Sequence, residues 1–200
     1  MVYGIKRNKL LTDECEAIAE EILRSFLKNR YGEKRPIDIS GFAIEYLHLD
    51  LEYKILSPDK SVCGLIRDNC VDVDYELGST GRIRFTIAHE CAHYIINHSI
   101  YKRNVNFPED YSACERLADK IASCLLMPKY LMEYSAECAN LKLPLTIYDN
   151  CTLKGYDYRN TKSASDLLKV SKSAYINRLK DLGKVSYGDR EIGRLIPVIV

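Results

Sequence analysis

The segment His89-Glu90-Cys91-Ala92-His93 has the residue types and the spacing of a metal-dependent hydrolase. Residues four apart on a helix lie on one face, so both imidazoles can reach one cation without a loop between them. Imidazole is a good ligand for zinc. Glu90 lies one step round the helix, beside such a metal, where its carboxylate can accept a proton from water. The segment therefore predicts a zinc site with Glu90 as general base.

A catalytic zinc site needs a third protein ligand and one open coordination position. His98 follows His93 by five residues, which is about 140° round a helix, so we expect it to point away from the metal face. A histidine near a helix end also suits the helix dipole. The third ligand must therefore come from another part of the chain.

Glu115 and Asp119 lie four residues apart on a later predicted helix and share a face. This layout offers one carboxylate to the metal and a second to the free N–H of a ligand imidazole. Ser112 and Glu115 also have the spacing of a capping box, so Glu115 could instead cap its own helix. Asp119 could equally lie on a solvated helix face. The spacing leaves these alternatives open.

The apolar pattern predicts the elements that position these residues. Helices are predicted at 13–30, 37–47, 82–97, 113–127 and 130–141, with two more between 164 and 182. Strands are predicted at 49–56, 63–67 and 70–74, and a loop at 143–160. We expect an α+β fold with a mainly helical catalytic core, a small antiparallel sheet and a C-terminal helical extension. The predicted domains are residues 1–145 and 146–200.

The composition excludes several classes of protein. Twenty-nine basic and 28 acidic residues give a net charge of +1, so no field of the whole chain favours nucleic acid or a membrane surface. No apolar run approaches the roughly 20 residues of a spanning helix, and no apolar block follows the basic residues near the start. The eight cysteines include no C-x-x-C pair, which favours reduced thiols. We therefore expect a cytoplasmic protein.

Two blocks, Arg84-Phe-Thr-Ile-Ala-His-Glu-Cys-Ala-His-Tyr-Ile-Ile96 and Glu115-Arg-Leu-Ala-Asp-Lys-Ile-Ala-Ser-Cys-Leu-Leu-Met-Pro128, resemble the ImmA/IrrE family of metallopeptidases. The family pattern is R-F-T-x-A-H-E-x-x-H, a spacer, then E-x-x-A-[ND]-x-x-A-x-x-L-L-M-P. Weaker similarity extends the resemblance to about residues 36–183.

The resemblance implies a zincin-like core, similar to the gluzincins, in which His89, His93 and Glu115 bind zinc. It also implies that Glu90 is the general base, and Asp119 stays the candidate partner of a ligand histidine. Cys91 departs from the usual residue of the family, but its position on the helix directs its side chain away from the metal.

The implied function is that of a zinc-dependent endopeptidase. Members of this family often cut a helix-turn-helix transcriptional repressor, so such a repressor is the expected protein partner, and its cleavage would derepress genes. The alternatives are a DNA-binding or repressor-binding regulator that has a structural zinc site and no peptidase activity. Residues 162–184 carry six basic and two acidic side chains and look like a helix-turn-helix. DNA binding there is possible, but we favour an extension that closes the core.

Overall fold

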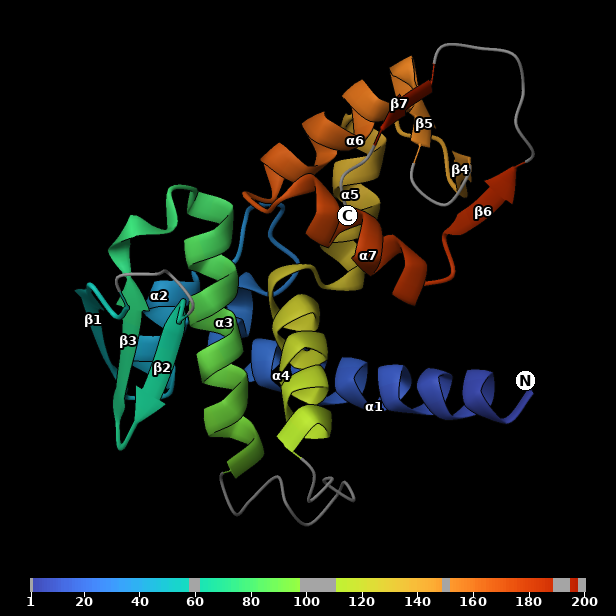
Figure 1. Cartoon of the computed structure of the whole chain (residues 1–200). Helices are drawn as coiled ribbons and strands as arrows, with labels where there is room; N and C mark the ends of the chain where they lie inside the picture. The colour runs from blue at the N-terminus through green and yellow to red at the C-terminus, as the bar shows by residue number, and fades with distance from the viewer. Residues whose placement is uncertain (1, 58–61, 98–110, 149–151, 189–194, 198–200) are drawn as a thin grey trace. The chain divides into compact units, whose positions relative to one another are not determined.

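The structure is a computed structural model that describes residues 2–57, 62–97, 111–148, 152–188 and 195–197 (Figure 1). The chain divides into two compact units, Met1–Glu33 with Ile37–Pro128 and Lys34–Pro36 with Lys129–Val200. The contacts thus place the break between residues 128 and 129. The predicted domain boundary between residues 145 and 146 stays a prediction.

Three long helices form most of the first unit: α1 (Val2–Leu27), α3 (Thr80–Asn97) and α4 (Tyr111–Leu126). Helix α4 packs against both α3 and α1. Their facing sides are apolar and buried, as in Cys91 and Ile95 of α3 and Leu117 and Ile121 of α4. Burying such side chains contributes about 1.5–3 kcal/mol each for the larger ones, which makes the α3–α4 interface a firm support for polar residues at its edge.

The predicted helix at 37–47 forms as one α-helical turn, α2 (Ile39–Gly41), followed by a π-helical turn, η2 (Phe42–Tyr46). Asp38 caps it, because its Oδ1 accepts a hydrogen bond of 3.0 Å from the Gly41 N–H. Phe42 is buried as expected, but Ile44 is 50% exposed. The apolar pattern of the 37–47 segment predicts that Ile44 faces inward like Phe42; this prediction is wrong, because the wider π turn changes which residues share a face.

The first unit also contains a three-stranded sheet of β1 (Asp50–Lys54), β2 (Gly64–Arg67) and β3 (Cys70–Asp74) in the order β1-β3-β2. Strand β3 runs antiparallel to β2 and parallel to β1. The prediction of an antiparallel sheet was therefore wrong, and the sheet is mixed. The β2–β3 hairpin turns β3 back beside β1, and β2 is left at the edge.

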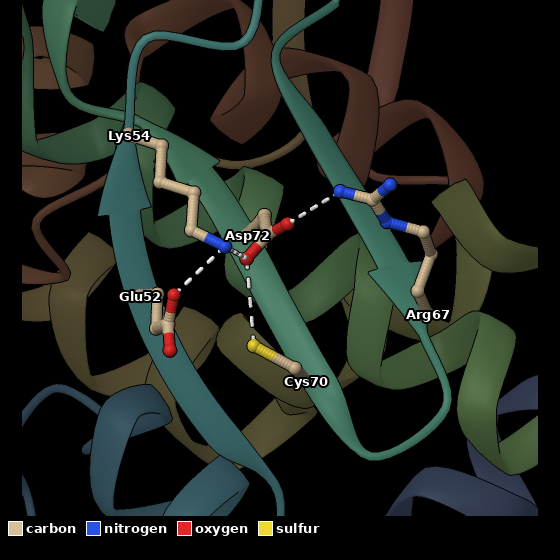
Figure 2. A network of polar contacts seen from close by, with 5 residues as sticks. All are labelled: Glu52, Lys54, Arg67, Cys70 and Asp72. Atoms are coloured by element: carbon tan, nitrogen blue, oxygen red, sulfur yellow. Dashed lines mark hydrogen bonds and ion pairs between the residues drawn. The ribbon is translucent and has the colours of Figure 1, made fainter.

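Strand β3 is largely buried on both faces. The face that carries Cys70 and Asp72, called the outer face here, holds a polar network (Figure 2). The Asp72 carboxylate accepts contacts from Lys54 Nζ at 2.8 Å and from Arg67 Nη2 at 3.1 Å, and the Cys70 thiol lies 3.4 Å away. Hydrogen bonding from Lys54, more than from the other partners, holds the pKa of Asp72 below its usual value against the opposing effect of burial. The pairing explains how a carboxylate can lie in the middle strand of a sheet.

The second unit contains α5 (Lys129–Cys138), α6 (Gly155–Leu167) and α7 (Lys172–Asp181) with a four-stranded sheet. The sheet order is β6-β4-β5-β7, with β4 at Leu145–Tyr148, β5 at Thr152–Lys154, β6 at Val185–Gly188 and β7 at Leu195–Pro197. The predicted loop at 143–160 was therefore wrong, and the C-terminal part is not purely helical. Leu145 and Ile147 are buried, and β4 pairs in parallel with β6, about forty residues later in the chain.

The predicted turn between the last two helices is confirmed. Ser171 is the N-cap of α7, because its Oγ accepts a hydrogen bond of 3.1 Å from the Ala174 N–H. Tyr175 and Ser135 join α7 to α5 through a buried hydroxyl–hydroxyl contact of 3.0 Å. Arg178 is completely buried, so the face of α7 that carries these residues belongs to the core of its unit.

Two further observations concern the described residues alone. No helix among them is both long enough and apolar enough to cross a bilayer. Seven cysteines lie in this part of the chain, and no disulfide joins any two of them: Cys15, Cys63, Cys70, Cys91, Cys114, Cys124 and Cys138.

Candidate metal and active site

Helices α3 and α4 bring together three groups that can bind a metal ion. Nε2 of His89 lies 3.0 Å from Nε2 of His93, as expected for residues four apart on one helix. The Glu115 carboxylate reaches across from α4, with Oε2 at 3.3 Å from the first imidazole and Oε1 at 3.1 Å from the second. The three sequence-predicted ligands therefore meet at one point of the first unit.

These distances fit a zinc ion. Ligand atoms held tetrahedrally at about 2.0–2.1 Å from zinc lie about 3.3–3.4 Å from one another. The observed separations of 3.0, 3.1 and 3.3 Å are close to that value. Two imidazole nitrogens and one carboxylate also make the ligand set of a catalytic site, which leaves a coordination position for water.

Asp119 fixes the orientation of His89, the first of the two candidate ligand histidines. Its Oδ1 lies 2.8 Å from Nδ1 of His89, so the Nδ1–H donates to the carboxylate and the Nε2 lone pair points toward Glu115. Burial lowers the pKa of His89, but the hydrogen bond and charge of Asp119, with the charges of Glu90 and Glu115, raise it above its ordinary value. Burial and the neighbouring imidazole lower the pKa of His93.

Glu90 lies beside this group and is only 7% exposed. Burial raises the pKa of Glu90 above its usual value, although the charge of His89 and the backbone N–H of Ile66, on strand β2, oppose the shift. A carboxylate with a raised pKa is a stronger base, which suits proton transfer from water.

A cleft of about 660 Å³ runs between strand β2 and helix α3, past the metal-ligand group. Gly64 lets these two elements approach closely. A Cβ on this residue would lie 2.9 Å from Oε1 of Glu90 and closer still to Cγ2 of Thr86. The described residues that line the cleft are Val62, Cys63, Gly64, Leu65, Ile66, Arg82, Phe85, Thr86, His89, Glu90, His93 and Glu115.

Among the described residues, strand β2 forms the wall of the cleft and the unpaired edge of its sheet. The Asp74 N–H donates to the Cys63 carbonyl at 2.9 Å, which places the odd-numbered residues of β2 in hydrogen-bonded pairs with β3. Because hydrogen-bonded and non-hydrogen-bonded pairs alternate along an antiparallel ladder, the backbone N–H and C=O groups of Gly64 and Ile66 point away from β3. The effect of the Ile66 N–H, which lowers the pKa of Glu90, agrees with that direction.

Sequence reasoning missed this wall. The strand itself was predicted, but the pattern of a four-residue strand does not reveal which helix it faces. The glycine at position 64, inside a run of apolar residues, was the available signal, since a glycine within a strand often marks a close approach. His98 lies outside the described residues.

A second group that could hold a cation is Glu52, Cys70 and Asp72 on the outer face of the sheet. The Lys54 ammonium already lies there, 2.7 Å from Glu52 and 2.8 Å from Asp72 (Figure 2). This lysine supplies the positive charge that the carboxylates need, so the group is a structural ion-pair network.

A sequence profile of the IrrE N-terminal-like domain, peptidase family M78, matches residues 75–180. The chain belongs to this family. The match to the IrrE-like domain contains the three converging ligands, Glu90 and Asp119, and it supports a metallopeptidase-like function and hence a hydrolase. Strands β1 to β3, which precede residue 75, lie outside the match. A comparison with curated proteins gives no match.

Proposed function

We propose that this protein is a zinc-dependent endopeptidase that cleaves a helix-turn-helix transcriptional repressor. The observation that carries the peptidase proposal is the convergence of His89, His93 and Glu115 next to a buried Glu90, in a cleft with a free strand edge as its wall. Membership of the IrrE-like family supports the same reaction class.

The residues of the chain divide the chemistry among them. His89, His93 and Glu115 would hold the metal, and Asp119 keeps the first imidazole in the tautomer that can ligate. A bound zinc ion would act as a Lewis acid toward water and toward a carbonyl group. Glu90 would take the proton of the attacking water and deliver it to the leaving amine.

The strand edge explains how an extended peptide could be placed. Gly64 presents an N–H and a C=O toward the cleft, and an extended chain can pair with such groups as an added strand. The same residue lies against Glu90, because a Cβ at position 64 would be 2.9 Å from Oε1 of Glu90. A peptide bond paired at this edge would therefore lie close to the proposed base.

The proposal that the substrate is a repressor is supported by the resemblance to a family whose members often cut such proteins. The C-terminal helices give little support to the DNA-binding alternative. Of the six cations between residues 162 and 184, Arg178 is buried and Lys162 pairs with Asp166 at 2.5 and 2.6 Å.

The test compares four zinc-loaded proteins: the parent, Glu90→Gln, Glu115→Gln and the control Glu133→Gln, which changes an exposed carboxylate of α5. Each is incubated with the repressor encoded beside it and, separately, with a mixture of random peptides. Bound zinc is measured on the same samples. We expect cleavage by the parent and by the control, zinc but no cleavage for Glu90→Gln, and loss of both for Glu115→Gln.

Other outcomes identify which part fails. Cleavage of peptides but not of the repressor would refute the target. An intact repressor that co-elutes, with no peptide cleaved, would favour the binding alternative, and salt-dependent duplex binding would favour the DNA-binding one. Parental cleavage by metal-loaded Glu90→Gln would refute the role of this base.

A further inference from the structure

The cleft carries a positive charge at a fixed distance from the metal-ligand group. Among its described lining residues, Arg82 is the one arginine or lysine, whereas the carboxylates of Glu90 and Glu115 lie at the other end. Arg82 is exposed. Within the described part of the chain its guanidinium contacts the thiol of Cys63, with Nη2 at 3.1 Å from Sγ, and pairs with no carboxylate.

The helix places this cation in line with the site. Arg82, Phe85, His89 and His93 follow one another at intervals of three, four and four residues, so they form one stripe along α3. Seven residues separate Arg82 from His89, which is about 10 Å along the helix axis. An extended peptide rises about 3.3 Å per residue, so this distance corresponds to about three residues of substrate.

The direction of the peptide follows from the edge strand. Position 63 lies beside Arg82, and position 64 lies beside Thr86 and Glu90, so β2 and α3 run in the same direction along the cleft. An added strand that pairs antiparallel to β2, the commoner arrangement, runs the opposite way. Residues on the C-terminal side of the scissile bond then lie toward Arg82.

We propose that Arg82 determines specificity by binding a substrate carboxylate two or three residues C-terminal to the scissile bond. This inference rests on the proposed peptidase function. The carboxylate has two sources, an Asp or Glu side chain within a longer chain or the free C-terminus of a short peptide. A guanidinium binds either of them with charge-assisted hydrogen bonds.

The experiment begins with random 14-residue peptides with blocked termini, cleaved by the zinc-loaded parent and sequenced at the new N-termini. The best sequence is then made with Glu, Gln or Lys at the second or third position after the cut. A further peptide ends at that position with a free carboxylate or an amide. We expect kcat/KM for the Glu peptide to exceed that for the Gln peptide by about 2–5-fold, since solvent screens an ion pair with an exposed guanidinium.

Three substitutions at the same position separate charge from structure. Arg82→Gln should abolish the preference, Arg82→Lys should retain part of it, and Arg82→Glu should reverse it toward the Lys peptide. Arg30→Gln, which changes an exposed arginine outside the cleft, is the matched control and should leave the preference intact. Zinc content and thermal unfolding of each variant show that it is folded.

The outcomes distinguish this inference from the proposed function. Zinc-dependent cleavage with no preference for an acidic group, or a preference that persists in Arg82→Gln, would overturn the role of Arg82 and leave the peptidase standing. An acidic preference on the N-terminal side would also overturn it. If the parent cleaves no peptide at all, the peptidase proposal itself fails, and the inference falls with it.

Discussion

The carboxylate of Asp119 lies 2.8 Å from Nδ1 of His89, so helix α4 supplies both a candidate ligand and the group that orients another ligand on α3. A hydrogen bond of this kind fixes the imidazole tautomer and makes the ring a better ligand. The two helices must therefore keep their register for the site to form. The buried apolar contacts between α3 and α4 provide that constraint.

Replacing Asp119 with alanine should weaken zinc binding by about 10–100-fold while the fold is kept. The side chain of Asp119 is 57% exposed, so its removal leaves no buried cavity. Zinc affinity is measured by competition with a chromogenic chelator, and thermal unfolding of the metal-free proteins serves as the control. Equal zinc affinities for the variant and the parent would contradict the orienting role.

Gly64→Ala should reduce peptidase activity by at least about tenfold with little loss of zinc. The added methyl would crowd Glu90 and Thr86, so either the base or the strand edge must move, and a displacement of about 1 Å can cost about 100-fold in rate. Bound zinc and kcat/KM are measured on the same preparation.

A second substitution tests the cause. Thr86→Ser removes the Cγ2 atom nearest to the added methyl and keeps the hydroxyl. The double variant Gly64→Ala/Thr86→Ser should recover part of the lost activity, with Thr86→Ser alone close to the parent. If the double variant is no better than Gly64→Ala, steric crowding between β2 and α3 is not the reason for the loss.

The metal-ligand helix was predictable because its information is local. Two histidines and a glutamate within five residues define a face of one helix, and the apolar residues around them define the buried side. Glu115 was harder, because its partnership with His89 and His93 depends on how α3 and α4 pack. The spacing alone left Glu115 as a ligand or a cap, and the family resemblance favoured the ligand.

The parts that were not predictable depend on contacts between distant residues. Leu145 and Ile147 form a strand because they pair with β6, and a pattern of four residues among Pro, Thr and Asn does not show that partner. The mixed sheet has the same origin, since only the pairing of residues 50–54 with 70–74 decides that β1 and β3 are parallel. Likewise, nothing in the sequence near Arg82 showed that it lines the cleft.

Cys91 lies inside the metal-binding motif, yet we expect it to take no part in ligation. It is fully buried, and burial raises the pKa of its thiol to about 12, so the thiol stays protonated at neutral pH. A protein loaded with Co²⁺ in place of zinc should therefore lack the thiolate-to-metal charge-transfer absorption. Cys91→Ala should bind metal with the same stoichiometry, and a charge-transfer band that disappears in this variant would show the expectation to be wrong.

The Asp72 network should make stability depend on pH in the acid range. Because the pKa of Asp72 is lower in the folded protein than in an unfolded chain, its contribution is present above about pH 4 and is lost as the pH falls through the folded-state pKa. Asp72→Asn should lower the free energy of unfolding by about 1–3 kcal/mol at pH 7, where the carboxylate is ionised. The difference from the parent should shrink below pH 4.

Denaturant unfolding at several pH values measures this difference, with Glu52→Gln as the control, since Glu52 contacts the same Lys54 but its side chain is 55% exposed. A loss of stability in Asp72→Asn that is the same at every pH would mean that packing, and not the charge of Asp72, holds the outer face of the sheet together.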